Sequence, residues 1–198
     1  MTDELTHYKW LTSDGRGSYG HGDYSAFKPN GKPGGWTPSI TPRLCATGYH
    51  VCTADHLIAH ARVGAELWVV ETKGRADHGG DKSAFEQIRL VELVGVATSS
   101  LLIEFACDAA ERVLPIFEAR IPGDDRPRRA IIAARAARAA AAAAAADAAR
   151  AAYADAARAA AAAAYADAAD AAAAAAERRW QGDRLLALVT GSREAVPA

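Results

Sequence analysis

Polar side chains that could bind a ligand crowd into residues 73–83, which read KGRADHGGDKS. Asp77, His78, Asp81 and Lys82 supply two carboxylates, an imidazole and an amine within this short segment. Glycine-rich polar sequence between two apolar runs predicts a loop joining strands, and such loops present polar groups without burying them. The loop is therefore the best candidate binding site in the chain, although the same composition is typical of an ordinary solvated hairpin connection.

A second group of reactive side chains lies between residues 45 and 60. Cys45, His50, Cys52, His56 and His60 follow the spacing C-x4-H-x-C-x3-H-x3-H. Zinc is not favoured, because a strand would point His50 and Cys52 to one face and Cys45 to the other, and the compact C-x2-C element is absent. Cys52 beside His50 is the one candidate nucleophile and base, but a buried structural cysteine fits alternate strand positions better. We therefore predict no metal and no cofactor.

Aromatic side chains punctuate the glycine-rich residues 12–42 and their flank. They either pin a coil-rich region to the core or line a ligand cleft, and the first role is the commoner one. In the second case Trp36 would form a pocket with His50 and with the polar residues 77–82. The candidate binding residues are thus Trp36, His50, Asp77, His78, Asp81 and Lys82.

The sequence around these residues predicts alternating strands and helices, which would position them. Residues 44–52 predict a strand, residues 54–63 a helix capped by Thr53, and residues 66–72 and 85–94 two further strands. All six histidines lie within the first hundred residues. We therefore expect an α+β fold, with a small mixed or antiparallel sheet in a domain spanning residues 1–100.

The second half has a different composition. Residues 128–181 are mostly alanine and contain neither glycine nor proline, so nearly all of them are expected to be helical. A block of twelve residues repeats at 151–162 and 163–174, and twelve residues return a side chain about 120° from its starting direction, so no single apolar stripe results. The run forms either one long rod or, as we favour, a folded-back helical bundle or long helical hairpin.

These patterns divide the chain into an α+β domain at 1–100, an alanine-rich helical region at 101–190 and a disordered tail at 191–198. Residues 177–189 restore apolar content and are expected to dock on the alanine-rich helices as a cap.

Composition and charge narrow the function classes. The formal net charge is −1 and neither half is strongly basic, so no nucleic-acid partner is indicated. The sequence contains no apolar stretch long enough to span a bilayer and no signal-peptide core, which predicts a cytoplasmic protein without a membrane partner. Three cysteines in such a compartment do not predict a disulfide framework.

The first half resembles an uncharacterised small domain common in bacteriophage and bacterial genomes. The resemblance rests on LCATGYHVC at residues 44–52, on VETKG at residues 70–74, on Asp81-Lys82 and on the strand QIRL at residues 87–90. These match the pattern C-x2-G-x-H-x-C, V-E-x-x-G and D-K over residues 8–96. The resemblance implies a phage or prophage origin, and it carries no assigned activity.

The second half is similar, over residues 113–139, to the opening of an all-helical immunity-protein family of bacterial polymorphic toxin systems. In this interpretation one helix ends near Arg120, residues 122–123 form a turn, and an aspartate at 124 or 125 caps the next helix, with Pro127 in its first turn. Beyond this segment alanine replaces the glycine-containing break and the histidine-bearing helices of the family. Individual toxin contacts therefore cannot be transferred to this chain.

The leading hypothesis is a non-enzymatic, phage- or prophage-type binding protein with an immunity-like role, whose partner is a toxin or another copy joined through the alanine-rich helices. It is favoured because the sequence lacks a phosphate loop, a dinucleotide fingerprint and a recognisable catalytic triad. The alternative is a small-ligand or nucleotide-binding domain, or an enzyme similar to ADP-ribosyltransferases, with its pocket in the first domain. A structural component of the virion is the third possibility.

Overall fold

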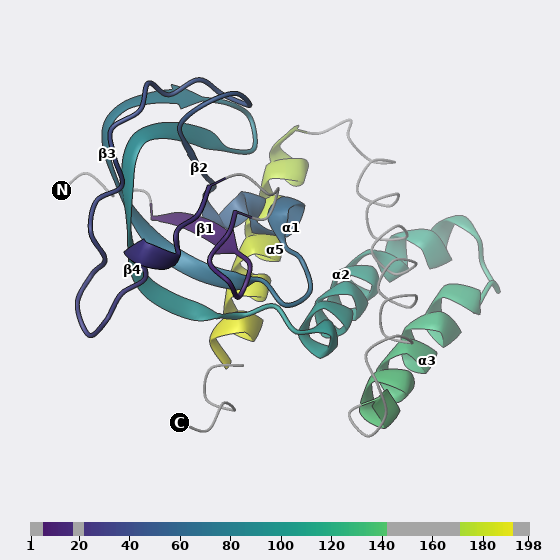
Figure 1. Cartoon of the computed structure of the whole chain (residues 1–198). Coiled ribbons are helices and arrows are strands. Elements are labelled where there is room, and N and C mark those ends of the chain that lie inside the picture. Colours follow the sequence, from purple (N-terminus) through teal and green to yellow (C-terminus); the bar gives the residue numbers. More distant parts are fainter. Residues whose placement is uncertain (1–5, 18–21, 142–170, 192–198) are drawn as a thin grey trace. The chain divides into compact units, whose positions relative to one another are not determined.

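The computed structural model describes residues 6–17, 22–141 and 171–191. They form two compact units (Figure 1). The first unit contains the described residues up to Ala97 together with those from Arg178 onward, and the second contains Thr98–Glu177. An antiparallel sheet in the first part followed by helices confirms the predicted α+β fold class.

The first unit is built on a four-stranded antiparallel sheet in the order β1-β3-β4-β2. The strands span His7–Leu11 (β1), Glu66–His78 (β3), Ser83–Val96 (β4) and Tyr49–Val51 (β2). The two edge strands also meet, because Tyr8 and Cys52 exchange backbone N–H···O bonds of 2.8 and 3.0 Å. The sheet therefore curls into a small closed barrel, which leaves few strand edges exposed.

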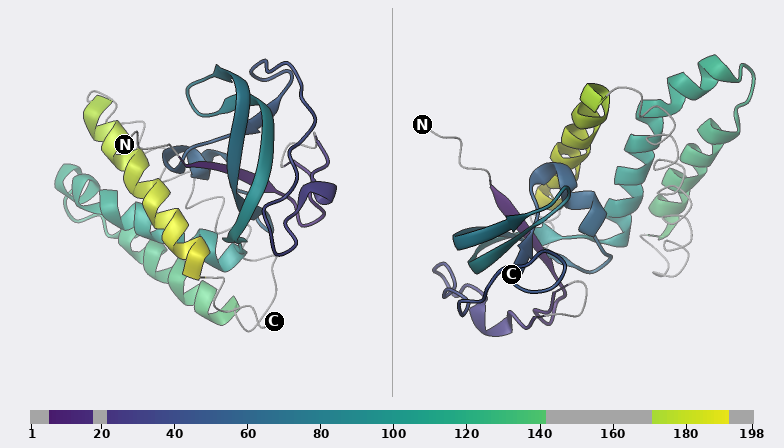
Figure 2. Two further views of the ribbon diagram at one scale, coloured as in Figure 1. Left: turned by 90° about the vertical axis from the view of Figure 1, so that its left-hand side faces the viewer. Right: turned by 90° about the horizontal axis from the view of Figure 1, so that it is seen from above.

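Strong bending of the long β3–β4 hairpin makes this closure possible, and the left-hand view of Figure 2 shows its curvature. The pairing of β3 with β4 shifts register between Leu67 and Trp68, between Val69 and Val70, and between Lys73 and Ala76. Such bulges bend a strand and increase its twist. Gly74 lies in the last of them with a φ of 84°, a conformation that disfavours residues with a side chain.

The core of the barrel combines residues of all four strands with Tyr24, which lies outside the strands. It contains Leu11, Tyr24, Val51, Trp68, Val70, Phe85, Ile88 and Leu90. Lys9 is buried with them, since its side chain and that of Leu11 lie two residues apart on β1 and share a face. A short 3-10 turn, η1 (Ser25–Phe27), follows Tyr24 in the glycine-rich segment.

Several local predictions in this unit are wrong at their boundaries. Of the strand expected at residues 44–52 only β2 forms, because residues 43–47 make a turn with Cys45 at a φ of 58°. The helix expected at residues 54–63 is reduced to a 3-10 turn, η2 (Ala54–His56), and one helical turn, α1 (Leu57–His60). The side chain of Thr53 does not cap it, and bonds the Asp55 carboxylate instead.

The loop expected at residues 73–83 is also mostly absent. Strand β3 continues to His78 and β4 begins at Ser83, so only residues 79–82 form the turn between them. Backbone pairing across the hairpin overrides the polar, glycine-rich composition that predicted a loop.

Helix α5 (Ala171–Gly191) completes the first unit with its residues from Arg178 onward. Gly182, Leu185 and Val189 share one helical face and are all buried. Gly182 lies against the backbone of Ala54, and Val189 lies against Gly95 of β4. The expectation that this segment caps the alanine-rich helices is therefore wrong, because its buried face packs on the sheet unit.

The second unit begins with two antiparallel helices, α2 (Ser99–Arg120) and α3 (Arg126–Ala141). Thr98 caps α2 by accepting a 3.2 Å hydrogen bond from the Leu101 N–H. The helix end at Arg120 and the capping aspartate are confirmed, since the Asp124 carboxylate accepts a 3.1 Å bond from the Arg126 N–H. Ile103, Cys107 and Leu114 of α2 pack on Ile131 of α3.

Two predictions for the second half lie largely outside the described residues. They are the fold-back of the alanine run, most of which falls at residues 142–170, and the disordered tail, of which only Gly191 is described. No helix in the described part of the chain is long and apolar enough to cross a membrane.

Candidate functional site

His50 and Asp77 lie in one row across the sheet, since each of them is paired with Ala84 of β4. Both bind the turn at residues 43–47. The Leu44 N–H donates to Asp77 Oδ2 at 2.7 Å, and the Cys45 N–H donates to His50 Nε2 at 3.0 Å. Together these bonds hold the left-handed conformation of Cys45, which costs a residue with a side chain about 1–2 kcal/mol.

His50 performs this role as a neutral imidazole, because a ring nitrogen that accepts a hydrogen bond carries no proton. Burial lowers the pKa of His50, and the nearby cations of Lys9 and Lys82 lower it further. Its carbonyl oxygen also accepts a 2.7 Å bond from Lys9 Nζ. His50 therefore helps to organise the chain around it, and its Nε2 lone pair already accepts the Cys45 N–H.

His78, Asp81 and Lys82 make local contacts around the β3–β4 turn. His78 Nδ1 lies 2.9 Å from Ser83 Oγ, and the ring of His78 meets Phe85 edge to face. Asp81 Oδ2 lies 3.4 Å from His60 Nε2 of α1, and Lys82 Nζ lies 3.8 Å from Asp81 Oδ1. These pairs tie the turn to its neighbours.

Trp36 lies on a different part of the sheet. Its ring is flanked by two cations, with the Arg89 guanidinium carbon 5.0 Å and Lys73 Nζ 5.7 Å from the ring centroid. The segment that carries it runs beside β4, where the Thr37 N–H bonds the Ile88 carbonyl at 2.9 Å. Ile88 is four residues along β4 from Ala84, roughly 13 Å at about 3.3 Å per residue. The structure thus brings His50 together with Asp77, and Asp81 together with Lys82, and places Trp36 apart from them.

A surface hollow of about 260 Å³ exists elsewhere on the first unit, lined by Thr12, Ser13, Arg62, Val63, Gly64 and Ala65. None of the candidate binding residues lines this hollow. The assignment of those six residues to ligand binding therefore stays a prediction from the sequence.

The cysteines and histidines do not assemble into a metal site within the described residues, where no group of three or more His, Cys, Asp or Glu could hold an ion. Burial raises the pKa of the Cys52 thiol to about 12 and also raises that of Cys107. A thiol with a raised pKa carries little thiolate at neutral pH and is a poor nucleophile. Cys45 is exposed, and all three cysteines are free thiols.

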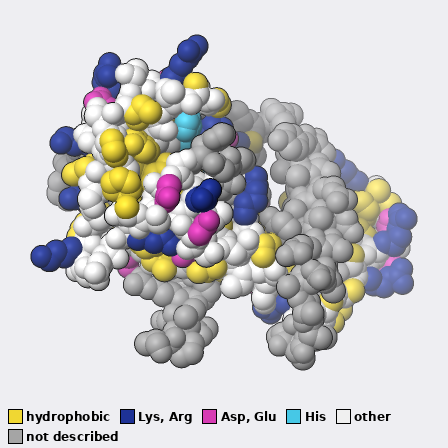
Figure 3. Space-filling view, in the orientation of Figure 1, with side chains coloured by type: hydrophobic (Ala, Val, Ile, Leu, Met, Phe, Trp, Pro, Cys, Tyr) yellow, Lys and Arg dark blue, Asp and Glu magenta, His cyan; other side chains and the backbone are white. Residues whose placement is uncertain are grey.

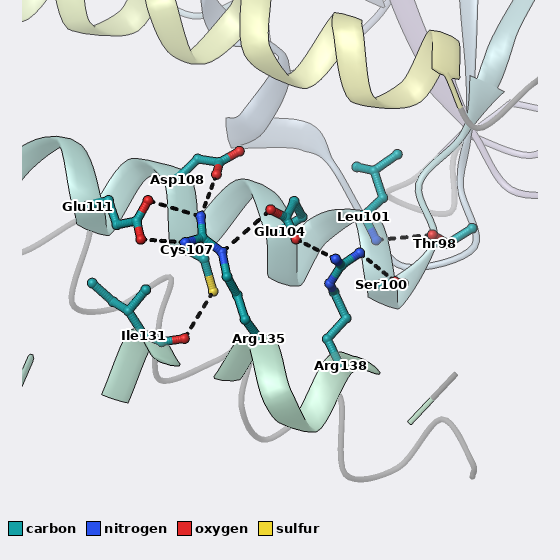
Figure 4. Close-up of polar contacts among 10 residues, drawn as sticks. All are labelled: Thr98, Ser100, Leu101, Glu104, Cys107, Asp108, Glu111, Ile131, Arg135 and Arg138. Carbon is teal, nitrogen blue, oxygen red and sulfur yellow. Dashed lines mark hydrogen bonds and ion pairs between the residues drawn. The ribbon is translucent and has the colours of Figure 1, made fainter. Parts of the chain in front are cut away.

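The most extensive polar arrangement in the described chain lies in the second unit, between α2 and α3 (Figure 4). Glu104, Asp108 and Glu111 occupy one face of α2, at i, i+4 and i+7, and all three approach Arg135 of α3. Arg135 lies 3.5 Å from Glu104 and 2.8 Å from Asp108, and it also pairs with Glu111. The Glu111 carboxylate, through its hydrogen bonds, raises the pKa of Arg135 above its usual value.

Arg138 extends this arrangement by one helical turn. Its guanidinium lies 2.9 Å from Glu104 Oε2 and 3.4 Å from the Ser100 hydroxyl. At the other end of the helix pair, Arg128 forms a bidentate ion pair with Glu118, with distances of 3.0 and 2.9 Å. Carboxylates on one helix and arginines on the other therefore fix the register of the pair over most of its length.

Sequence reasoning missed this network, although part of its signal was present. The acidic residues of α2 recur at helical spacing, and α3 carries five arginines and no acidic residue. Such one-sided charge on two neighbouring helices is typical of an antiparallel pair held by ion pairs. Which arginine meets which carboxylate depends on the length of the turn and on the packing of Ile131, which the pattern alone does not give.

Comparison with known proteins gives a match to a family model over residues 92–186, just under half of the chain. The family is described as "Imm-5 like putative immunity protein". No curated protein and no solved structure matches the chain. The match contains both helices of the ion-paired hairpin and extends well beyond residues 113–139, where the immunity-type resemblance was predicted. That resemblance of the second half is confirmed, whereas the resemblance of the first half to a phage domain stays a prediction.

Proposed function

We propose that this chain is an immunity protein that binds a toxin and thereby protects the cell that makes it. The observation that carries the proposal is the match of residues 92–186 to an immunity-protein family. Binding of a protein partner is the activity that such a family implies, and a cytoplasmic site of action is part of the proposal. A phage or prophage origin and self-association through the alanine-rich segment are further predictions from the sequence.

The geometry of α2 and α3 supports a binding role. The two helices are joined by an apolar cluster around Ile131 and by the ion pairs of Arg135, Arg138 and Arg128. A surface that is already ordered before binding loses little conformational entropy when the partner arrives. The helix pair is thus suited to present a fixed surface to another protein.

Co-expression tests the proposal. Toxin domains of polymorphic toxin systems, beginning with any encoded beside this gene, would be induced in bacteria with and without this chain, and growth would be measured. We expect this chain to restore growth against one toxin domain and not against unrelated ones. Isothermal titration of the purified chain with an inactive variant of that toxin would show direct binding. A chain that restores growth against none of the domains and binds none of them would refute the proposal.

A further inference from the structure

One side of α3 faces solvent and is apolar over residues 132–137. Ile131 packs against α2, and the next residue, Ile132, is 62% exposed, the largest exposed fraction among the large hydrophobic residues that are described. Ala133, Ala136 and Ala137 lie on the same side of the helix and are exposed as well. Alanine surfaces allow another backbone to approach closely. An isoleucine that projects from a smooth alanine surface has the shape of an anchor residue.

Arginines surround the first part of this side. Arg126 and Arg129 have 79% and 70% of their side chains exposed. The carboxylate of Asp124, which pairs with Arg126, is only 10% exposed, so the guanidinium covers the carboxylate and points outward. In Figure 3 the right-hand edge, where α2 ends and α3 begins, shows Lys and Arg side chains with acidic ones among them, beside hydrophobic ones. Arg129 pairs with Asp125 at 3.1 Å, and the Asp125 side chain is 64% exposed, so the surface offers two outward arginines and one exposed carboxylate beside an apolar anchor.

We propose that this side of α3, defined by Arg126, Arg129, Ile132, Ala133 and Ala136, is where the toxin docks. The inference rests on the proposed function and names the surface that carries it. The complementary partner presents carboxylates around an apolar hollow that receives Ile132. Interfaces are enriched in arginine, and a few buried anchor residues supply most of their binding energy.

Ile116 of α2 provides a matched control for Ile132 of α3. Ile116 of α2 is 48% exposed, but it follows Cys107, which packs on α3, by nine residues. Nine residues turn a helix by about 180°, so Ile116 points away from α3. Ile116→Asp and Ile132→Asp thus make the same change at exposed positions of one helix pair, and only the second alters the proposed surface.

The test measures the dissociation constant of each variant with the inactive toxin domain that the wild-type chain binds. We expect Ile132→Asp and Arg129→Glu each to weaken binding about 10-fold or more, and Ile116→Asp to leave it unchanged. Binding of the wild type should also weaken as salt is raised, because exposed charges are screened. If wild type and variants bind equally well, this inference fails while the proposed function stands. If the wild type binds no toxin domain, both fail.

Two further measurements exclude other occupants of this side of α3. An exposed isoleucine contributes little to stability, so Ile132→Asp should melt within a few degrees of wild type. A large loss of thermal stability would mean that another part of this chain covers the surface, and would overturn the proposal. Light scattering would overturn it as well if the wild type proved to be a dimer and Ile132→Asp a monomer, because a second copy would then be the occupant.

Discussion

At the scale of the residue, the least expected feature is Lys9. It lies inside the barrel with 7% of its surface exposed, and no ion pair joins it to a carboxylate within the described part of the chain. Its amine donates to the His50 carbonyl and lies 4.6 Å from the centroid of the Tyr24 ring. Burial lowers the pKa of Lys9 to about 8, because the charged amine is poorly solvated there. Keeping this lysine charged at neutral pH therefore lowers the free energy of unfolding.

This cost predicts that the contribution of Lys9 to stability rises with pH. Between about 8 and the ordinary value of 10.5, Lys9 of the unfolded chain binds a proton that Lys9 of the folded chain releases, so its contribution to the free energy of unfolding increases through this window. The full gain is about 3 kcal/mol. Denaturant unfolding at pH 7.5 and at pH 10 would measure it. The Lys9→Met variant should lack this contribution, and an equal rise with pH in both proteins would contradict the assignment.

At the scale of the element, α5 and the ion-paired hairpin show how helices of modest apolar content are held in place. Helix α5 approaches the first unit through Gly182, where a side chain would overlap the backbone of Ala54. In the hairpin, α3 is mainly alanine and arginine, and its charged residues supply the contacts that larger apolar side chains would otherwise make. The positions of both helices are therefore determined by contacts of a few specific residues more than by helix propensity.

Gly182→Ala tests the close approach of α5. On an isolated helix this change would stabilise by about 1 kcal/mol, because alanine is the better helix former. In the folded chain we expect a loss of roughly 1–3 kcal/mol, since the new methyl group must displace the Ala54 backbone. Thermal unfolding would give the sign of the change. Gly191→Ala is the control, because nothing lies within 4 Å of that position.

Arg135→Ala tests the hairpin. Glu104, Asp108 and Glu111 would lose a shared cation, and we expect the second unit to lose roughly 1–3 kcal/mol of stability, as is usual for hydrogen bonds to charged groups. Arg129→Ala removes an exposed i,i+4 pair on the same helix and should cost less than about 1 kcal/mol. Hydrogen exchange of the α3 amides, measured in each variant, would compare the two losses of stability. Equal effects would mean that the Arg135 network contributes no more than a surface pair.

At the scale of the whole molecule, the chain does not fold as two successive segments. The first unit takes its last helix from the C-terminal part of the sequence, beyond the whole of the second unit. Leu185 and Val189 of that helix are fully buried. The stability of the sheet therefore depends on residues more than eighty positions away from its last strand.

A chain that ends at Glu177 should accordingly lose the fold of its first unit. Burying Leu185 and Val189 contributes about 1.5–3 kcal/mol each, and their removal would also expose the core beneath them, against a total stability of about 5–15 kcal/mol for a typical domain. Near-ultraviolet circular dichroism would follow Trp10 and Trp68, which lie in this unit. A chain that ends at Gly191 retains α5 and serves as the control. An unchanged spectrum in the shorter chain would show that the sheet folds without the helix.

The sequence by itself determined the elements whose signal is local. Helix propensity, the capping aspartate, the proline and glycine of the α2–α3 turn and the alternation along β4 act within a few residues, and they predict an α+β chain with a helical second half. The immunity-type character of that half was predicted from the resemblance of residues 113–139. The site residues were predicted by type, but the same types also hold turns, as His50 and Asp77 do at Cys45.

Tertiary structure alone decided which distant residues meet. It closed the barrel through Tyr8 and Cys52, joined α5 to the sheet at Gly182, and paired Arg135 with three carboxylates of α2. It also extended β3 through the glycine-rich stretch that composition assigned to a loop. These outcomes depend on register and on the fit of two surfaces, and such long-range contacts leave no periodic trace in a single sequence.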